Sequence, residues 1–411
     1  MATNSLLPVD IKTVVNSLIA QAGGGSLTAT DTSTMITVAQ AAQLYGYETL
    51  LNALSLQIGR TLIAIRPYKG DDFGVEVDNQ TYGQISRKIS YYANEFEDSQ
   101  DWNTAASGAG FTLKDGASVD HYKIKKQYPL EMQFGGNKIL QKHITRWLYQ
   151  LDVAFRSNED LSRFIAGLSI ENQNEIAMMK EVRNRAILLN FMAGLYNVGT
   201  ARTKVNLTKE FNEKNGTTYT SAQLRTEHLK EFLAFLVSHI QYDSDMMEKN
   251  TDLFHLTPAK NDDSGNALKL YRHTPKSEQN LVLLAPLLYD AEANVLPEIF
   301  HDGYLKLDNF RRISYWQSPE KGSEGMINVT PNQLKVSDGT TVKGTAVTKP
   351  FIVGCMYDRA ALMSTFRLER TITTPDNAGG AYVNTFYHWA NDFMNDFTEN
   401  AILYYMEDDE A

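Results

Sequence analysis

The residues that could carry out chemistry do not occur at any catalytic spacing. Glu227 and His228 are adjacent on a predicted helix, but the second histidine one turn away that would complete a zinc site is missing. Neither a phosphate-binding glycine loop nor a G-x-S-x-G nucleophile turn is present. Asp358 and Glu369 are isolated carboxylates among 49 acidic residues, where some close pairs arise by chance. The sequence therefore predicts no enzyme, no metal site and no cofactor.

Length, charge and cysteine content describe a folded protein that does not bind nucleic acid tightly. Its 411 residues exceed the roughly 250–300 at which a single core stops growing, so two or more lobes are expected. The net charge of −10 is opposite to that of a protein that neutralises many phosphates. The single Cys355 cannot form an intrachain disulfide, which fits a reducing compartment. Since no apolar run approaches the about 20 residues that a membrane helix needs, neither export nor membrane insertion is expected.

Two segments with β-branched and aromatic residues in partial alternation, residues 82–96 and 119–134, predict a pair of strands. The segment between them is rich in Gly, Ser, Asn and Asp and predicts a loop tip. An isolated two-stranded ribbon is at best marginally stable in water, so this one needs a further surface. That surface belongs either to another subunit or to its own domain.

The ribbon carries basic side chains, although the molecule as a whole is acidic. We therefore expect these side chains to contact acidic neighbouring subunits. Arg311 and Arg312, near Trp316, could instead stack on nucleic acid, but adjacent strand residues point to opposite faces, and ion pairs between subunits are the plainer interpretation. The residues that we expect at inter-subunit contacts are Arg87, Lys88, Trp102, Lys123, Lys125, Lys126, Arg311 and Arg312.

A long amphipathic helix is predicted from Ser157 to about Asn197. Asp160 stands three residues after Ser157, which is a capping pattern, and apolar residues then recur near 3.6-residue spacing. About 40 residues would form a rod of roughly 60 Å, although Gly167 could bend it. The alternatives are a long core helix of another fold or a coiled-coil arm.

The other segments predict an α+β protein. Residues 1–60 comprise an amphipathic piece, a glycine hinge at 23–25 and an Ala-rich helical stretch ending at Ile58; the first piece is either an arm that hooks a neighbour or a frayed terminus. Residues 61–67 predict a strand, and residues 220–242 predict a helix with Ser221 as a possible cap. Short apolar runs at 281–290, 309–316 and 351–363 predict strands alternating with helices. Residues 317–350 predict surface loops or a small hairpin, and the acidic end of the chain a solvated tail.

The closing segment 369–406 carries an aromatic block at Tyr382, Phe386, Tyr387, His388 and Trp389, in which His388 is expected to be a half-buried packing residue. This segment resembles the closing strands of major capsid proteins of tailed bacteriophages, the Hong Kong 97 fold, and especially its small-podophage branch. The order of arm, ribbon, long helix, α+β lobe and a returning strand-and-helix run extends the resemblance over nearly the whole chain.

The resemblance implies an α+β Hong Kong 97-type capsid fold with five parts. They are an N-terminal arm (1–60), an extended loop, or E-loop, with flanking strands (61–135), a peripheral domain with a long spine helix (136–240), an axial domain (241–363), and return strands of the peripheral domain with the C-terminus (364–411).

The function implied is that of a major capsid protein that self-assembles as hexamers and pentamers into an icosahedral head. Its implied partners are copies of itself, a separate scaffolding protein, a portal protein and packaged double-stranded DNA contacted non-specifically. It would be part of the virion and be made and assembled in the bacterial host cytoplasm. An encapsulin-like compartment shell is the first alternative, and an α+β hydrolase is the second.

Overall fold

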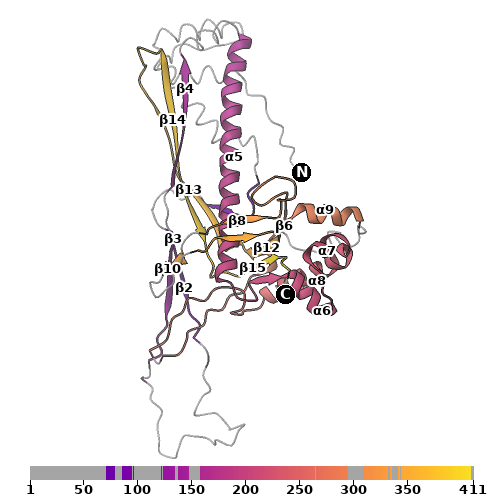
Figure 1. The fold of residues 1–411 in the computed structure, drawn as a ribbon. Helices are drawn as coiled ribbons and strands as arrows, with labels where there is room; N and C mark the ends of the chain where they lie inside the picture. Colours follow the sequence, from indigo (N-terminus) through magenta and orange to yellow (C-terminus); the bar gives the residue numbers. More distant parts are fainter. Residues whose placement is uncertain are drawn as a thin grey trace, which may run out of the picture. The chain divides into compact units, whose positions relative to one another are not determined.

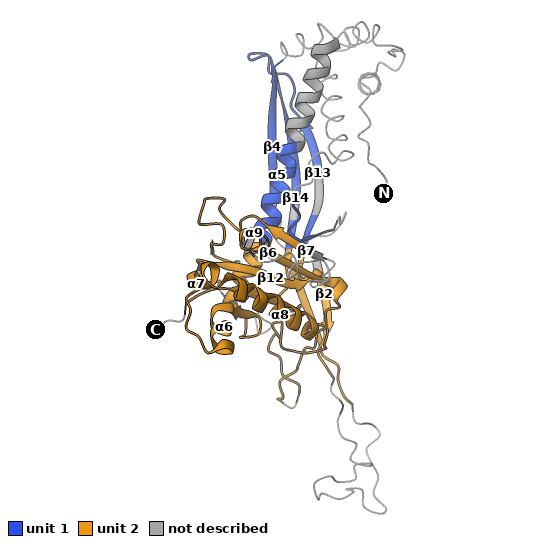
Figure 2. Cartoon of the chain, turned by 90° about the vertical axis from the view of Figure 1, so that its right-hand side faces the viewer, with its two compact units in different colours: residues 1–84, 136–187, 363–393 blue, residues 85–135, 188–362, 394–411 orange. Residues whose placement is uncertain are grey.

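The computed structural model describes most of the chain from Asp71 to Asp408 and mixes helices with strands, as an α+β fold does (Figure 1). The described residues are 71–78, 86–94, 96, 122, 124–134, 138–147, 158–263, 265–294, 309–331, 334–335, 341–342 and 344–408. The predicted arm, the strand at 61–67 and the loop tip of the ribbon lie outside them. The chain divides into two compact units, residues 1–84, 136–187 and 363–393 in unit 1 and residues 85–135, 188–362 and 394–411 in unit 2 (Figure 2).

These units do not follow the domain boundaries expected from the sequence. Residues 188–240, expected beside the spine helix in the peripheral domain, belong to unit 2, together with most of the expected axial domain. The final residues 394–411 also belong to unit 2, because the last strand pairs with that unit's sheet.

Unit 1 contains a sheet with the strand order β1-β13-β14-β4. Its strands are β1 (Glu76–Asp78), β13 (Leu362–Thr373), β14 (Tyr382–Asn395) and β4 (Lys138–Trp147). From Tyr382 to Trp389 of β14 the side chains alternate, with Val383, Thr385, Tyr387 and Trp389 buried and the residues between them half-buried. The predicted strand-and-helix run is wrong here: the described residues of this segment include no helix, because the apolar period of the β14 residues is 2 rather than 3.6.

The predicted long helix is confirmed as α5 (Asn158–Val198), 41 residues that continue through Gly167 without a break. At about 1.5 Å per residue it forms a rod of about 60 Å. Residues 158–187 of α5 belong to unit 1 and residues 188–198 to unit 2. Within unit 1, α5 is tied to the sheet by an ion pair between Glu175 and Lys142 of β4.

Unit 2 is built on a five-stranded sheet with the order β5-β15-β12-β6-β7. Its strands are β5 (Lys204–Asn206), β15 (Ala401–Tyr405), β12 (Ile352–Asp358), β6 (Gln279–Leu284) and β7 (Asn309–Ile313). Every residue of β12 and β6 is buried, which explains why both strands are almost continuously apolar. Position 354 requires a glycine, because a Cβ there would stand 2.4 Å from the carbonyl oxygen of Val282 on the adjacent strand.

Helices α6 (Leu207–Asn215), α7 (Ser221–Thr226) and α8 (Leu229–Met247) add a packed layer to this unit. The single helix predicted over 220–242 is wrong, because it breaks at Glu227 and His228, where the His228 ring stacks on Tyr219 at 3.9 Å. The predicted cap at Ser221 is also wrong. Thr220 is the cap: its hydroxyl accepts from the Gln223 backbone N–H, and the Gln223 side chain accepts from the Thr220 backbone N–H.

The apolar run at 281–290 changes from strand to helix at Ala285, the first residue of α9 (Ala285–Asn294). Pro286 fits there because the first turn of a helix has free N–H groups anyway. The small hairpin predicted within 317–350 is confirmed as two nested antiparallel pairs, β8 (Ile327–Val329) with β11 (Val347–Lys349) and β9 (Leu334–Lys335) with β10 (Thr341–Val342).

The predicted solvated acidic tail is not free along its described part. Glu407 forms an ion pair with Lys349 and exchanges backbone hydrogen bonds with the side chain of Asn206. A carboxylate oxygen of Asp408 accepts from the backbone N–H of Ser221 at 2.5 Å. These contacts attach the end of the chain to unit 2.

Replacement of the cap residue should destabilise unit 2 measurably. Thr220→Ala removes the side-chain acceptor at the start of α7 and should lower the free energy of unfolding by about 1 kcal/mol. Ser221→Ala is the matched control and should change it by less than about 0.5 kcal/mol. Urea unfolding followed by tryptophan fluorescence measures both, and equal losses in the two variants would contradict the assignment of the cap.

Candidate assembly surfaces

The ribbon predicted from the sequence is present in unit 2 as the hairpin of β2 (Ser86–Tyr91) and β3 (Pro129–Phe134), which pair with no other strand among the described residues. Lys88 of β2 points inward and places its Nζ 2.5 Å from a carboxylate oxygen of Asp396 and 2.5 Å from one of Glu399. The Asp396 side chain is completely buried. Burial alone would lower the pKa of Lys88, but these two carboxylates outweigh that effect and raise the pKa.

Further contacts join the base of the hairpin to the rest of unit 2. The Arg272 guanidinium donates to the Ser90 hydroxyl at 2.7 Å and lies 3.6 Å from Glu399. Tyr92 packs with Leu130 and Leu270 in a small apolar cluster, and its hydroxyl donates to a backbone carbonyl. The base of the hairpin therefore packs on its own domain. This was the second of the two surfaces considered for the ribbon, the first being another subunit.

A buried polar chain lies behind this attachment. The His255 ring has its Nε2 2.9 Å from the Leu270 carbonyl oxygen and its Nδ1 3.1 Å from the side chain of Asn400. Asn400 donates to Thr274, whose hydroxyl donates to Asp358 at 2.7 Å. Burial lowers the pKa of the His255 ring below its ordinary value.

The opposite face of the hairpin is rich in apolar groups that water can reach. Alternation along β2 turns Ile89 and Tyr91 outward, with exposed fractions of 61% and 58%. Phe96, Tyr122 and Ile124, which lie beyond the paired residues of β2 and β3, are almost fully exposed. We call these five residues the hairpin apolar face. Such a concentration of exposed large apolar side chains is unusual for a monomer and typical of an interaction site.

The predicted contact residues are divided among several positions. Arg87 is exposed and lies 3.6 Å from Glu131, Lys126 is exposed and lies 3.8 Å from Asp263, and Lys125 is exposed. Lys88 neutralises carboxylates of its own chain. Arg311 and Arg312 lie on β7, an edge strand of the five-stranded sheet, where Arg311 is half-buried and Arg312 is exposed beside the Phe310 ring. Trp102 and Lys123 lie outside the described residues.

A second candidate surface lies on one face of the sheet of unit 1. His143 and Trp147 of β4 stand directly opposite Phe386 and Tyr382 of β14. The His143 and Phe386 rings stack at 5.7 Å, and the Phe386 and His388 rings stack at 6.4 Å. Trp147 packs edge-on against Tyr382 at 5.3 Å and remains 40% exposed. These five residues form what we call the aromatic sheet face.

Sequence reasoning identified part of this face but not its arrangement. It treated the aromatic block of β14 as one cluster, whereas Tyr387 and Trp389 are buried on the other side of the sheet. The prediction that His388 is a half-buried packing residue is confirmed. His143 and Trp147 were missed, although the alternation of Ile139, His143 and Trp147 in β4 was the signal that could have found them.

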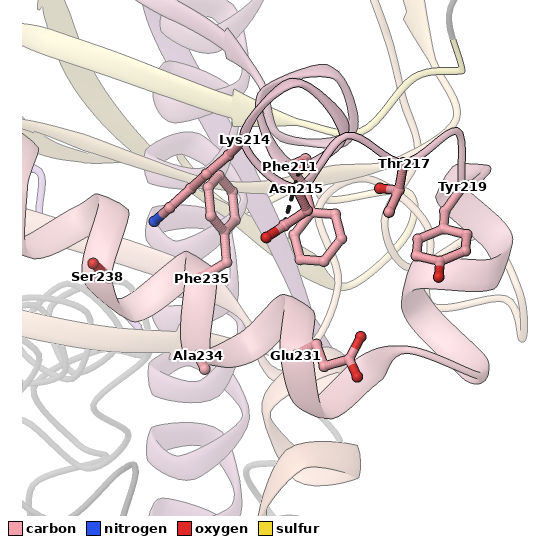
Figure 3. Close-up of a pocket in the computed structure, with 9 residues that line it drawn as sticks. All are labelled: Phe211, Lys214, Asn215, Thr217, Tyr219, Glu231, Ala234, Phe235 and Ser238. Atoms are coloured by element: carbon pink, nitrogen blue, oxygen red, sulfur yellow. Dashed lines mark hydrogen bonds between the residues drawn. The ribbon is translucent and has the colours of Figure 1, made fainter.

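A cavity of about 410 Å³ lies between α6 and α8 (Figure 3). Phe211, Tyr219 and Phe235 supply aromatic walls, Lys214 extends over the Phe235 ring, and Asn215 donates to the Phe211 carbonyl oxygen. No group of three or more metal-ligating side chains occurs here or elsewhere among the described residues. In the same part of the chain, none of the helices combines the length and the apolar character needed to cross a membrane.

Solved structures of phage particles have a similar fold. One chain of the capsid of Staphylococcus phage Andhra matches with a TM-score of 0.51 and 12% identity, over 84% of this chain and 86% of that chain. A structure of the head fiber and inner core protein gp22 of native bacteriophage P68 matches with a TM-score of 0.47 and 12% identity, over 84% and 86%. The mature capsid of bacteriophage PhiM1 matches with a TM-score of 0.43 and 10% identity, over 82% and 87%.

No family model matches the chain. No curated protein matches it either. The match to the Andhra capsid chain shows that this protein has the mixed helix-and-strand fold of a phage capsid protein, and that the similarity spans most of both chains.

The buried histidine should make stability depend on pH. Because the pKa of His255 in the folded state lies below its ordinary value, its contribution is complete above pH about 6.5 and is lost as the pH falls through the folded-state pKa. Between pH 7 and 5, His255→Gln should reduce the acid-induced loss of unfolding free energy, by up to about 1.4 kcal/mol per pH unit.

His239 is a control of opposite sign. Burial lowers its pKa, but the hydrogen bond and charge of Asp243 raise it by more, so its contribution is complete at low pH and is lost as the pH rises. His239→Gln should therefore steepen the loss of stability on acidification. Urea unfolding at several pH values measures both variants, and parallel curves for wild type and His255→Gln would contradict the prediction.

Proposed function

We propose that this chain is the major capsid protein of a tailed phage, with the Hong Kong 97 fold and in the small-podophage branch. The observation that carries the proposal is the fold match to a phage capsid chain along 84% of this chain. In this proposal the 41-residue helix α5 is the spine helix and the β2–β3 hairpin is the base of the E-loop. Copies assemble as hexamers and pentamers into an icosahedral head that encloses double-stranded DNA.

The proposed partners follow from that role. Copies of the chain form the wall, a separate scaffolding protein and a portal protein take part in assembly, and the packaged DNA is contacted non-specifically. The net charge of −10 supports weak contact with the DNA, because a wall that held phosphates tightly would hinder its entry. The protein is a component of the virion and is assembled in the cytoplasm of the bacterial host.

The exposed apolar groups supply the contacts between copies. We assign this role to the hairpin apolar face and the aromatic sheet face, together with the exposed basic residues Arg87, Lys125, Lys126 and Arg312. Trp102, Lys123 and Arg311 remain proposed contact residues, whereas the charge of Lys88 is used within its own chain. Each interface can be modest, because the many contacts of a closed shell act together.

Charge placed on the hairpin apolar face should block assembly but not folding. Ile89 and Tyr91 are more than half exposed, so the double variant Ile89→Asp and Tyr91→Asp should keep the circular dichroism spectrum of the wild type while closed shells fall at least tenfold in electron micrographs. Tyr242→Asp is the matched control, since Tyr242 is 52% exposed on α8 and lies outside both surfaces. Loss of shells in the control alone would refute the assignment.

The loop of the hairpin should also be needed for closure. Deletion of residues 99–117 should leave a subunit that folds, as judged by its thermal transition, but cannot form closed shells. Normal particles from this variant in electron micrographs would show that the loop has no such role. The contents of wild-type particles separate the main proposal from the compartment-shell alternative, because an enclosed enzyme in place of DNA would favour the latter.

A further inference from the structure

An apolar ridge on α5 is exposed to water among the described residues. Met178 and Val182 have exposed fractions of 58% and 60%, and Ala186 is exposed as well. Residues four apart in an α-helix form one continuous ridge, and such ridges pack into the grooves of another helix. We call Met178, Val182 and Ala186 the α5 ridge. A surface helix ordinarily turns such a row toward other protein rather than toward water.

The N-terminal part of the chain enters the described structure beside this ridge. Phe73 and Val75 are 1% and 3% exposed, and the Arg185 guanidinium of α5 stacks on the Phe73 ring at 4.8 Å. Arg185 comes seven residues, or about two turns, after Met178, so both lie on the same side of the helix. The 70 residues that precede Asp71 therefore lead away from a point next to the α5 ridge.

The sequence of that leading part contains a complementary segment. Residues 35–58 are rich in Ala and Leu and include one charged residue, Glu48. Tyr47, Leu51, Leu54 and Ile58 recur at the three- and four-residue spacing of an amphipathic helix. The link from Ile58 to Phe73 can span up to about 50 Å, while the ridge is only about 12 Å long. A tether of this length gives a high effective concentration at the ridge.

We propose that residues 35–58 pack as an amphipathic helix along the α5 ridge of the same chain. The segment supplies apolar side chains without charge, and the ridge supplies apolar side chains that the described residues leave exposed. Attachment of Phe73 to Arg185 favours the ridge of the same chain over that of another copy. This inference does not depend on the proposed function, because it concerns the single subunit and is tested on dilute, unassembled protein.

Engineered cysteine pairs test the contact directly. In the full chain, Leu51→Cys or Leu54→Cys is combined with Val182→Cys, and disulfide formation under mild oxidation is followed on non-reducing gels. The native Cys355 does not compete, because it is fully buried and burial raises the pKa of its thiol. At least one pair should form an intrachain disulfide at least tenfold faster than the matched control, in which Lys180→Cys, an exposed position on another side of α5, replaces Val182→Cys.

Each outcome decides the proposal. A fast intrachain disulfide supports it, equal rates for the two helix positions overturn it, and a disulfide-linked dimer overturns it in favour of docking on a second copy. Hydrogen exchange on the wild type gives a second measurement that needs no cysteine. Amides of residues 35–58 should exchange at least tenfold more slowly than in the isolated peptide, and Val182→Asp should remove this protection while β12 keeps its own. Unprotected amides in the wild type would also overturn the proposal.

Discussion

The position of the β2–β3 hairpin depends on Lys88, which ends between two carboxylates at the junction of β14 and β15. A two-stranded ribbon buries too little surface to stay ordered by itself, so its base must be attached elsewhere. The attachment is ionic and largely buried: one ammonium group meets Asp396 and Glu399 at 2.5 Å, and Arg272 joins Glu399 from a third segment. Buried charges of this kind are tolerated only as complete sets, and removal of one partner leaves the others uncompensated. The cluster therefore holds the base of the hairpin on the rest of unit 2.

That attachment also explains how one ribbon can have two different sides. Along β2 the inward residues are polar or charged and contact the same chain, whereas Ile89 and Tyr91 on the outward side remain in water. In the sheet of unit 1 the arrangement is comparable: Tyr387 and Trp389 are buried, while Phe386, His388 and Trp147 form a row on the other face. In both places the alternation of a strand turns one face toward the subunit's own core and leaves the other accessible to water.

The proposed role as a shell subunit has physical requirements that these features meet. It needs a core that stays folded before assembly, which the fully buried strands β12 and β6 supply. It also needs contact surfaces that are apolar enough to associate yet small enough to separate again when a copy is misplaced.

The sequence by itself determined the elements whose signal is local. The apolar period of residues 158–198 specified α5, because backbone geometry makes this period visible in the chain. The alternation of residues 382–389 carries a local signal for β14 as well, but a strand-and-helix run was expected there. It also indicated a ribbon with basic residues. Only the tertiary structure decided that Lys88 pairs with carboxylates of its own chain, since these partners are 308 and 311 residues away in the sequence. The same holds for the pairing of His143 and Trp147 with Phe386 and Tyr382. These contacts join segments that are distant in sequence, and no local periodicity carries information about them.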